Sequence, residues 1–387
     1  MNKLLITIFI VITLGSCKKD EPAPLEKTPS EANLDPESPL DPGEPEDLNP
    51  DVQVLSIDPN VTGWVESNTP IAFNSVAIGR KNAVTGIVNS ISLSKSGWTH
   101  PSVLHFRNPW MGYKYWAAVT PYPYSDNQYE NPHIFCSNDG VSWIEPAGIL
   151  NPIESCPETP GSYHSDVNLI RENNKLYCYW RTTASSERSL WVKSSLDGVH
   201  WSEKQFICKW PASGVDVIAP SMVPYNNQYY CYGVSTGELI PGSYFTNFSV
   251  RKMASSDLVS GFIPDKENGY NIVQVTNRPW GDQDPWHIEV KKINNIWLML
   301  VTTTNHNSYG GGGRLFFGYS MDGSTFTFIA KPLFAKGGST YKSSFHPMID
   351  YKNKCIKIEL WRAMMSDGWV VFRENFVIKA EMLKPSA

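Results

Sequence analysis

The sequence predicts an all-β domain: a five-bladed β-propeller with four-stranded antiparallel blades. Two recurring patterns carry this prediction. A short polar-to-apolar stretch that opens a strand recurs five times, and a Ser-x-Asp-Gly turn recurs three times. With Val103, Val167, Met222, Ile288 and Met348 taken as equivalent, the copies are about 55 to 66 residues apart, close to the period of propeller blades.

The strand openers share an apolar end, and four of the five carry a histidine. They are Thr99–Val103, Tyr163–Val167, Ile218–Met222, Asp284–Ile288 and Phe345–Met348. Each is followed by a polar turn and a second, aromatic-rich β-type run. The turns hold Asn, Lys and Gly, as in Asn226-Asn227 and Asn294-Asn295, and Asn tolerates the positive φ of tight hairpins. Each repeat therefore begins with a hairpin.

The expected hairpin strands pair in order along the chain. They are Val103–Phe106 with Tyr113–Val119, Val167–Ile170 with Leu176–Trp180, Met222–Tyr225 with Gln228–Val234, Ile288–Ile293 with Ile296–Val301, and Met348–Tyr351 with Cys355–Trp361. The fifth opener leads only to Trp369–Phe372 and Phe376–Ile378. We expect Val52–Ile57 or Ala72–Ile78 to supply the strand that closes the ring.

The Ser-x-Asp-Gly turns follow the third strand of three repeats. They are Ser137–Gly140, Ser195–Gly198 and Ser320–Gly323, with Trp143, Trp201 and Phe326 shortly after. The Asp should accept hydrogen bonds from the turn backbone, and Gly should take a left-handed conformation. In an up-and-down blade these turns lie on the face away from the openers, which argues against a catalytic role for Asp139, Asp197 and Asp322.

The N-terminus has the pattern of a bacterial lipoprotein signal, residues 1–17. Met1-Asn2-Lys3 precedes the apolar run Leu4–Leu14, and Leu14-Gly15-Ser16-Cys17 resembles the site at which Cys17 is lipidated. An ordinary secretory signal or a transmembrane anchor is the alternative, but the run is short for a span of about 20 residues. Residues 18–52 are rich in Pro, Glu and Asp, which predicts a disordered linker. Residues 53–387 form the propeller domain. We expect an outer-membrane lipoprotein exposed on the cell surface, in contact with the membrane through its lipid only.

Composition and net charge limit the classes of partner that we expect. The formal net charge is −5 and no basic cluster is present, so nucleic acid is not an expected partner. We expect a monomer. Six cysteines follow Cys17, and an exported protein can oxidise them. Cys178 and Cys231 fall at the same place in successive blades, so they are either a bridge or two small buried side chains. No cysteine spacing indicates a zinc site.

The face that carries the openers collects the chemistry. Strand starts contribute His100, His164, Asp166, Asp216, Asp284, His287 and His346. Loops between second and third strands contribute Tyr122, Tyr124, Asp126, Glu130, Arg181, Glu187, Glu238, His306, Tyr309 and Arg362. Carboxylates can do acid/base work on a glycosidic bond, and aromatic side chains can stack on sugars. This set predicts a carbohydrate site at the mouth of the propeller.

The openers and the five repeats resemble the propeller glycosidases of glycoside hydrolase family 43 and its relatives, over roughly residues 95–380. The resemblance implies an Asp base at the first opener, an Asp in blade two that tunes the acid, and a Glu acid in blade three. In this sequence His100 stands at the position of the Asp base. In blade three Ala219 stands at the opener, and no Glu lies beside it. The resemblance also implies a central metal, with His346 or His287 as ligand, and a calcium ion is the candidate.

We therefore predict Asp166 and Asp284 as core carboxylates, with Asp216 or Glu238 as the acid. Substrate-binding candidates are His100, His164, His287, Tyr122, Arg181, Trp286 and Arg362; His346 is the metal candidate. The function expected is a surface glycoside hydrolase that cuts a polysaccharide by carboxylate acid/base catalysis. The alternatives are a non-catalytic glycan-binding propeller, favoured by His100 and Ala219, and a sialidase-like enzyme, because the Asp turns resemble the sialidase Asp-box.

Overall fold

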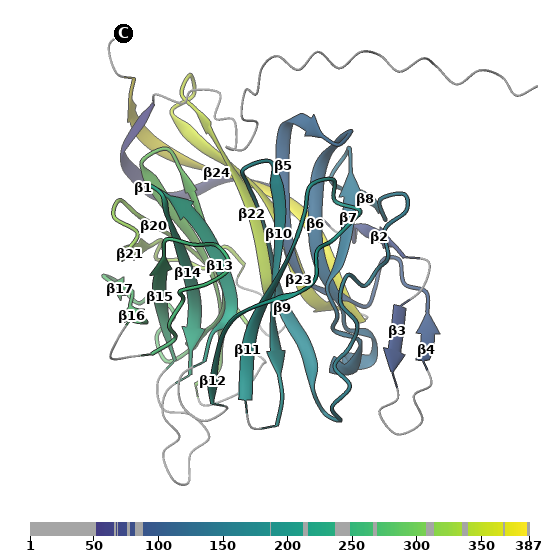
Figure 1. The fold of residues 1–387 in the computed structure, drawn as a ribbon. Helices are drawn as coiled ribbons and strands as arrows, with labels where there is room; N and C mark the ends of the chain where they lie inside the picture. The colour runs from purple at the N-terminus through teal and green to yellow at the C-terminus, as the bar shows by residue number, and fades with distance from the viewer. Residues whose placement is uncertain are drawn as a thin grey trace, which may run out of the picture. The chain divides into compact units, whose positions relative to one another are not determined.

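A computed structural model describes residues 52–65, 67, 69–75, 78–81, 88–185, 187–211, 216–236, 248–265, 269–306, 313–334, 340–366 and 368–384. All of them belong to one compact unit, Asp41–Ala387. The strands form five main sheets and one small hairpin (Figure 1). The inner strands β5, β9, β13, β18 and β22 each contact the inner strands of the two neighbouring sheets, so the sheets form a closed ring. The predicted five-bladed propeller is confirmed.

Blades one to three follow the chain order. Blade one holds β5 (Trp98–Trp110), β6 (Tyr113–Pro121), β7 (His133–Ser137) and β8 (Ser142–Ile144). Blade two holds β9 (Tyr163–Glu172), β10 (Lys175–Thr183), β11 (Glu187–Ser195) and β12 (Gln205–Pro211). Blade three holds β13 (Ile218–Tyr225), β14 (Gln228–Ser235), β15 (Ser249–Ser255) and β16 (Asn271–Ile272).

Blades four and five complete the ring. Blade four holds β18 (Asp284–Ile293), β19 (Ile296–Thr304), β20 (Leu315–Ser320) and β21 (Thr325–Phe328), and β17 (Gln274–Val275) adds a parallel edge to β21. Blade five holds β22 (Thr340–Asp350), β23 (Cys355–Ser366), β24 (Gly368–Leu383) and β1 (Gln53–Val65). Outside the blades lie the hairpin of β3 (Ile78–Lys81) and β4 (Val88–Ile91), and the short 3-10 helices η1 (Pro123–Ser125) and η2 (Asn127–Tyr129).

The N-terminal strand closes the ring. Strand β1 pairs antiparallel with β24, from Gln53 opposite Leu383 to Val65 opposite Asn375. In Figure 1 the purple β1 therefore lies beside β24. Of the two closing segments expected, Val52–Ile57 takes this role. β2 (Ala72–Asn74) instead adds a parallel edge to β8 in blade one. The two runs expected after the fifth opener are one continuous strand, β24.

The core is layered between the blades. Trp143 of blade one and Trp361 of blade five share one buried cluster, while Phe326 of blade four and Tyr232 of blade three share another. Bulky aromatic side chains fill the space between flat sheets, and each buries a large apolar area. Among the described cysteines, Cys178 and Cys231 are buried free thiols that lie in different clusters, so they do not form a disulfide.

The Asp turns behave as predicted. Asp139 Oδ1 accepts hydrogen bonds from the amides of Val141 (2.8 Å) and Ser142 (2.7 Å), and Gly140 has φ +70°. The other two predicted turns repeat this pattern. A further copy occurs in blade three, where Asp257 Oδ1 accepts from Val259 N at 2.8 Å. The sequence search missed it because Leu258 replaces the glycine.

A ring of hydrogen bonds between blades fixes which residues are equivalent. Four of them join a side chain of one inner strand to the backbone amide of the next: Ser344 to Val103, Ser102 to Leu169, Asn168 to Met222, and Ser221 to Val290, at 2.8–2.9 Å. The equivalent apolar residues are therefore Val103, Leu169, Met222, Val290 and, next to Ser344, Phe345. The equivalence assumed from the sequence is thus wrong by two residues in blades two and four and by three in blade five.

The displaced register has a local cause. Each inner strand has a register irregularity near its start, opposite the second strand of its blade. In three blades the third residue before the equivalent apolar position is left-handed: His100 (φ +51°), Asp166 (φ +55°) and Ala219 (φ +49°). Such bulges redirect a side chain. By the same offset, His287 and Lys342 take this position in blades four and five, so each blade contributes one residue to this level of the channel.

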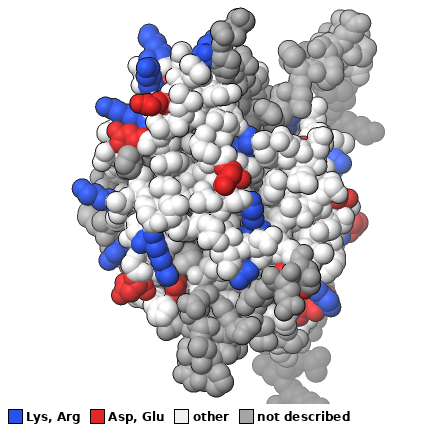
Figure 2. Space-filling view, turned by 90° about the vertical axis from the view of Figure 1, so that its left-hand side faces the viewer, with Lys and Arg blue, Asp and Glu red and all other residues white. Residues whose placement is uncertain are grey.

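The charged side chains are not segregated by sign on the face of the molecule that Figure 2 shows. On the face shown in Figure 2, Lys and Arg are interspersed with Asp and Glu over a mostly uncharged surface. In the part of the chain that the structure describes, no helix has the length and apolar character needed to cross a membrane.

Candidate metal centre

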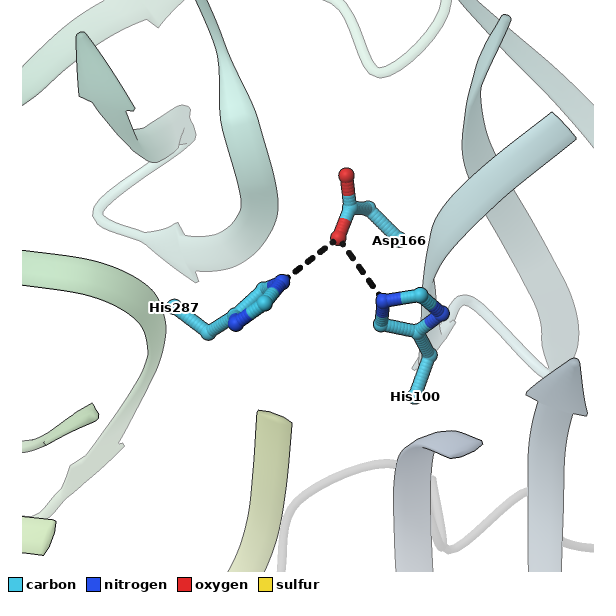
Figure 3. A group of neighbouring side chains, drawn as sticks. All are labelled: His100, Asp166 and His287. Atoms are coloured by element: carbon cyan, nitrogen blue, oxygen red, sulfur yellow. Dashed lines mark ion pairs between the residues drawn. The ribbon is translucent and has the colours of Figure 1, made fainter. Parts of the chain in front are cut away.

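Three of the five bulge-position residues meet at the centre of the ring. The Nε2 atom of His100 lies 3.3 Å from Asp166 Oδ1, and Nε2 of His287 lies 3.4 Å from the same oxygen. Figure 3 shows both imidazoles pointing at one oxygen of this carboxylate, His287 from the lower left and His100 from the lower right. The residues come from blades one, two and four, and their exposed fractions are 1%, 1% and 2%. One ligand atom from each lies within 4.8 Å of the others.

The spacing of these atoms fits a shared cation better than it fits hydrogen bonds. Among the described residues, His100 Nε2 and Asp166 Oδ1 are buried without a hydrogen-bond partner. Two ligand atoms that bind one ion tetrahedrally at about 2.1 Å stand about 3.4 Å apart. Two imidazoles and a carboxylate are the donor set of catalytic zinc sites and of related divalent-metal sites. The residues present therefore fit a divalent transition-metal ion.

A second layer of contacts orients these ligands. The other ring nitrogen of His100, Nδ1, lies 2.8 Å from Thr120 Oγ1 and 3.4 Å from Glu130 Oε1. The second oxygen of Asp166, Oδ2, lies 2.8 Å from Arg181 Nε. Outer partners of this kind fix the ring orientation of a metal-binding histidine and the rotamer of a metal-binding carboxylate. They leave Nε2 of His100 and Oδ1 of Asp166 directed at each other.

A relay of charges extends behind Asp166. Arg181 Nη1 lies 3.4 Å from both oxygens of Asp216, and Arg188 Nε lies 3.4 Å from Asp216 Oδ2. Asp216 Oδ1 also accepts hydrogen bonds from Trp210 Nε1 at 3.0 Å and from the amide of Val217 at 2.8 Å. Asp216 is thus held by four groups, and Arg181 connects it to Asp166.

Burial and charge set the protonation of the centre. Burial lowers the pKa of His100 well below its usual value and also lowers the pKa of His287, so both imidazoles are neutral and able to bind a metal. For Asp166, burial opposes ionisation, but the charge of Arg181 and the contact with His100 hold its pKa well below the usual range. Burial and the nearby Asp166 carboxylate raise the pKa of Glu130 well above the ordinary carboxyl value.

Three residues of this centre were not selected from the sequence. Glu130 was placed on the correct face but not chosen. Tyr341 packs on both imidazoles, with ring centroids 4.2 Å from His287 and 5.1 Å from His100. Lys342 is fully buried and directs Nζ to the carbonyl oxygen of Val167. Aligning Ser344 with Ser102 and Ser221 would have found Lys342 at the fifth bulge position.

The predicted catalytic carboxylates lie at different places in the structure. Asp166 lies at the centre, and Asp216 lies behind Arg181. Asp284 lies at the start of β18, with Oδ1 2.9 Å from Arg278 Nη2 and Oδ2 2.8 Å from His306 Nδ1. Glu238 lies outside the described residues, as does Cys17. Of the predicted carboxylates that are described, Asp166 is therefore the one with an oxygen in the three-residue cluster.

The predicted binding residues also separate. His100, His287 and Arg181 surround the centre. Both ring nitrogens of His164 have partners near its own strand: Thr182 Oγ1 in the same blade at 2.9 Å, and the carbonyl oxygen of Ser155 in the segment before β9 at 2.9 Å. Arg362 makes a buried two-point ion pair with Glu374, at 2.8 and 2.6 Å. Their geometry gives both residues structural partners.

The last candidates lie at intermediate places. Trp286 stacks on Phe248 with ring centroids 6.0 Å apart and borders His287. Tyr122 packs against Trp369, 5.6 Å between ring centroids, and burial raises its pKa to about 12. The metal candidate His346 lies beside His105, 4.9 Å between ring centroids, and it is not a member of the His100, Asp166 and His287 cluster.

Fold and site together define a class: a five-bladed β-propeller whose bulged inner strands gather two histidines and an aspartate in a buried centre. The sequence matches no family profile. It is 25% identical over 299 residues to the A type blood N-acetyl-α-D-galactosamine deacetylase of Flavonifractor plautii, a match that covers 64% of this chain and 37% of that protein. The chain thus spans little more than a third of this curated relative.

Two solved structures share the fold. The crystal structure of an N-acetylgalactosamine deacetylase from F. plautii, in complex with blood group B trisaccharide, superposes with a TM-score of 0.63 at 20% identity, covering 73% of this chain and 90% of that one. A thermostable family-43 glycoside hydrolase superposes with a TM-score of 0.50 at 14% identity, covering 76% and 95%. These likenesses confirm the propeller fold expected from the family-43 resemblance.

Proposed function

We propose that the protein is a metal-dependent hydrolase that removes the acetyl group from an N-acetylated amino sugar in a glycan. The observation that carries the proposal is the buried group of His100, Asp166 and His287, with ligand atoms 3.3 and 3.4 Å apart and Glu130 beside it. The similarity to a protein named as an N-acetylgalactosamine deacetylase supports the same chemistry.

The chain's own groups fit amide hydrolysis. A divalent ion held by His100, Asp166 and His287 would polarise the amide carbonyl and make bound water more acidic. Glu130 is buried beside His100, and burial raises its pKa above the ordinary carboxyl value, so its carboxyl group is the proton carrier of this proposal. It takes a proton from the attacking water and delivers it to the sugar nitrogen as the C–N bond breaks. The products are acetate and a free amino sugar.

Arg181 and Tyr341 complete the arrangement. Arg181 keeps Asp166 anionic and oriented through the 2.8 Å contact with Oδ2. Tyr341 packs on both imidazoles, and burial raises the pKa of its phenol, so the hydroxyl stays protonated as a donor. An amide oxygen that gains negative charge during the reaction needs such donors.

Glycoside hydrolysis is the second candidate, favoured by the shared fold with a family-43 enzyme. It needs two carboxyl groups that face one glycosidic bond, one of them able to donate a proton. Asp216 is held by four donors, and Asp284 is held by Arg278 and His306. These contacts leave both carboxylates less suited to proton transfer than Glu130, so deacetylation is the better supported chemistry.

The test separates the functions in one reaction. Full-length protein in detergent is stripped with EDTA and reloaded with Zn²⁺, Mn²⁺ or Co²⁺, then incubated with glycans that end in N-acetylgalactosamine or N-acetylglucosamine. We expect metal-dependent release of acetate without release of free sugar. Release of free sugar instead would establish a glycosidase, and retention of glycan without either product would establish a binding protein.

Two variants assign the roles. Asp166→Asn should lose both metal and activity, because the amide is a poor ligand. Glu130→Gln, assayed with the metal in excess, should lose at least about a hundredfold in rate, the usual scale of a lost proton carrier. Full activity of Glu130→Gln would remove Glu130 from the mechanism.

We also propose, from the sequence of residues 1–52, that the enzyme is anchored at the cell surface through Cys17. Metabolic labelling with a fatty acid should mark the wild type and leave Cys17→Ala unlabelled. Protease added to intact cells should cleave the anchored protein. Its resistance to protease would place it on the inner side of the membrane.

A further inference from the structure

A run of aromatic side chains leads away from the metal centre. Tyr341 packs on the two imidazoles, Trp369 packs on Tyr341 with ring centroids 4.8 Å apart, and Tyr122 packs on Trp369 at 5.6 Å. Tyr124 follows two residues later and is 87% exposed. We call Tyr341, Trp369, Tyr122 and Tyr124 the aromatic ladder. It runs from a buried end at the imidazoles to an exposed end in η1.

The ladder is built where blade five meets blade one. Tyr341 lies at the start of β22 and Trp369 at the start of β24, while Tyr122 and Tyr124 follow β6. Backbone hydrogen bonds of 2.6 Å join these segments, from Tyr122 N to Gly97 O and from Gly97 N to Trp369 O. All these segments lie at the end of the ring that holds the metal centre, because loops between second and third strands share that end with the strand starts.

Packing alone does not account for the outer part of the ladder. Trp369 and Tyr122 are partly exposed, and neither belongs to a hydrophobic core cluster of the described residues. Trp369 donates its indole N–H to Ser125 Oγ at 3.1 Å, which fixes the ring at the surface.

The backbone at the exposed end is also unusual. Tyr124 and Ser125 both have φ +56°. A left-handed conformation is a steric outlier for a bulky residue such as tyrosine, and outliers of this kind concentrate at ligand-binding sites. The conformation presents an aromatic ring to solvent in a loop tied to Trp369. Two independent features, a ring ladder and a strained aromatic tip, thus occur at one place.

We propose that the aromatic ladder is a second sugar subsite, which stacks the neutral sugar units that follow the amino sugar at the metal centre. This inference rests on the proposed function for the identity of the sugar at the centre. Aromatic faces suit the C–H surface of a sugar ring, and the ladder itself carries no charged side chain, so a neutral oligosaccharide is the matching ligand. The three ring-to-ring steps of 4.2, 4.8 and 5.6 Å extend beyond a single sugar ring.

The experiment measures binding against chain length. The full chain, metal-loaded and carrying Glu130→Gln to prevent turnover, is titrated calorimetrically with N-acetylgalactosamine, with blood group A trisaccharide and with the corresponding tetrasaccharide. We expect the oligosaccharides to bind at least roughly tenfold more tightly than the monosaccharide, the scale of one aromatic contact. Adding Trp369→Ala should abolish this gain and leave monosaccharide binding unchanged, whereas Trp369→Phe should keep most of it.

A matched control uses a second exposed tyrosine. Tyr225 lies at the β13–β14 turn, at the opposite end of its strand from the bulge, and is 37% exposed. Tyr124→Ala should weaken oligosaccharide binding and Tyr225→Ala should not.

The results distinguish the two proposals. Acetate release from the monosaccharide without any length preference keeps the proposed function and refutes the ladder. Equal loss for all ligands in Trp369→Ala makes the ladder structural. A third result is oligosaccharide binding that depends on Trp369 while the protein with Glu130 unchanged releases no acetate. That result would keep the ladder and refute the deacetylase.

Discussion

Two groups that combine histidines with a carboxylate lie at different positions along β5, and they differ in how the carboxylate is paired. In the candidate metal centre, His100 and His287 stand 3.3 and 3.4 Å from Asp166 Oδ1, a spacing that fits ligand atoms around a shared ion. In the second group, five residues further along β5, His105 Nδ1 lies 2.8 Å from Glu359 Oε2, and Arg373 contacts the other oxygen. We call His105, His346, Glu359, Arg373 and Tyr115 the closed network.

The comparison shows that residue type alone does not make a site. Burial opposes ionisation of Glu359, but its contacts with His105 and Arg373 lower the pKa to about 2, and each of its oxygens already has a close ion-pair partner. The carboxylate of Asp166 is satisfied on Oδ2 alone, and Oδ1 faces two neutral imidazoles. A bound ligand would therefore gain interaction energy with the first group and little with the second.

The largest expected effect tests this difference directly. His287→Ala removes one of three metal ligands, and direct ligands count for more than outer-shell partners, whose loss already costs about 10–100-fold in metal affinity. We expect loss of bound metal after dialysis and loss of acetate release. The measurement is metal content by mass spectrometry. His346→Ala in the closed network is the control, and equal metal loss in that variant would break the comparison.

A smaller effect is expected at Arg181. Arg181→Gln removes the 2.8 Å contact to Asp166 Oδ2 and frees the carboxylate to rotate. Metal affinity should fall about 10–100-fold, the range for outer-shell partners. Competition with a chelator measures this. Arg188 is one step further along the relay, so Arg188→Gln should lower the metal affinity less than Arg181→Gln does. A larger loss in Arg188→Gln would show that Asp216 rather than Arg181 supports the centre.

The closed network should contribute stability instead. Glu359→Gln leaves Arg373 and His105 without their partner, and a buried polar group that loses its partner costs about 1–3 kcal/mol. Urea denaturation should show this loss at pH 7. Metal content should match the wild type; a variant that folds well and lacks metal would tie this network to the centre.

A further prediction concerns the pH dependence of stability. Burial lowers the pKa of His164 to about 4, so the folded protein leaves it neutral while the unfolded chain protonates it below about 6.5. Stability from this residue is therefore present above pH 6.5 and lost as the pH falls toward 4, by about 1.4 kcal/mol per pH unit. His164→Gln should flatten the pH dependence of unfolding measured from pH 8 to 4. An unchanged slope would mean that His164 titrates normally.

Much of the fold could be predicted from the sequence because short-range residue patterns determine it. Repeated openers, Asn-rich hairpin turns and Asp turns each predict a short-range conformation, and the openers recur five times. The candidate that survives, Asp166, was found with His100 and His287 because polar residues at strand starts must gather near the axis of a propeller.

The register could not be read in the same way. Val103 and Leu169 are equivalent through hydrogen bonds between blades, and a bulge displaces the polar residue that precedes each of them. The sequence pattern instead grouped His100 with His164, His287 and His346. One residue of displacement turns a side chain to the other face of a strand, so an error of two or three residues replaces one set of channel residues by another.

The sequence by itself determined that five β-blades form a ring with a polar mouth, because strand, turn and repeat signals act over a few residues. Only the tertiary structure decided that His100, Asp166 and His287 share one centre, that Glu130 stands beside it, and that Arg362 belongs to an internal ion pair. These outcomes depend on distances between blades far apart in the chain, and no local pattern encodes such distances.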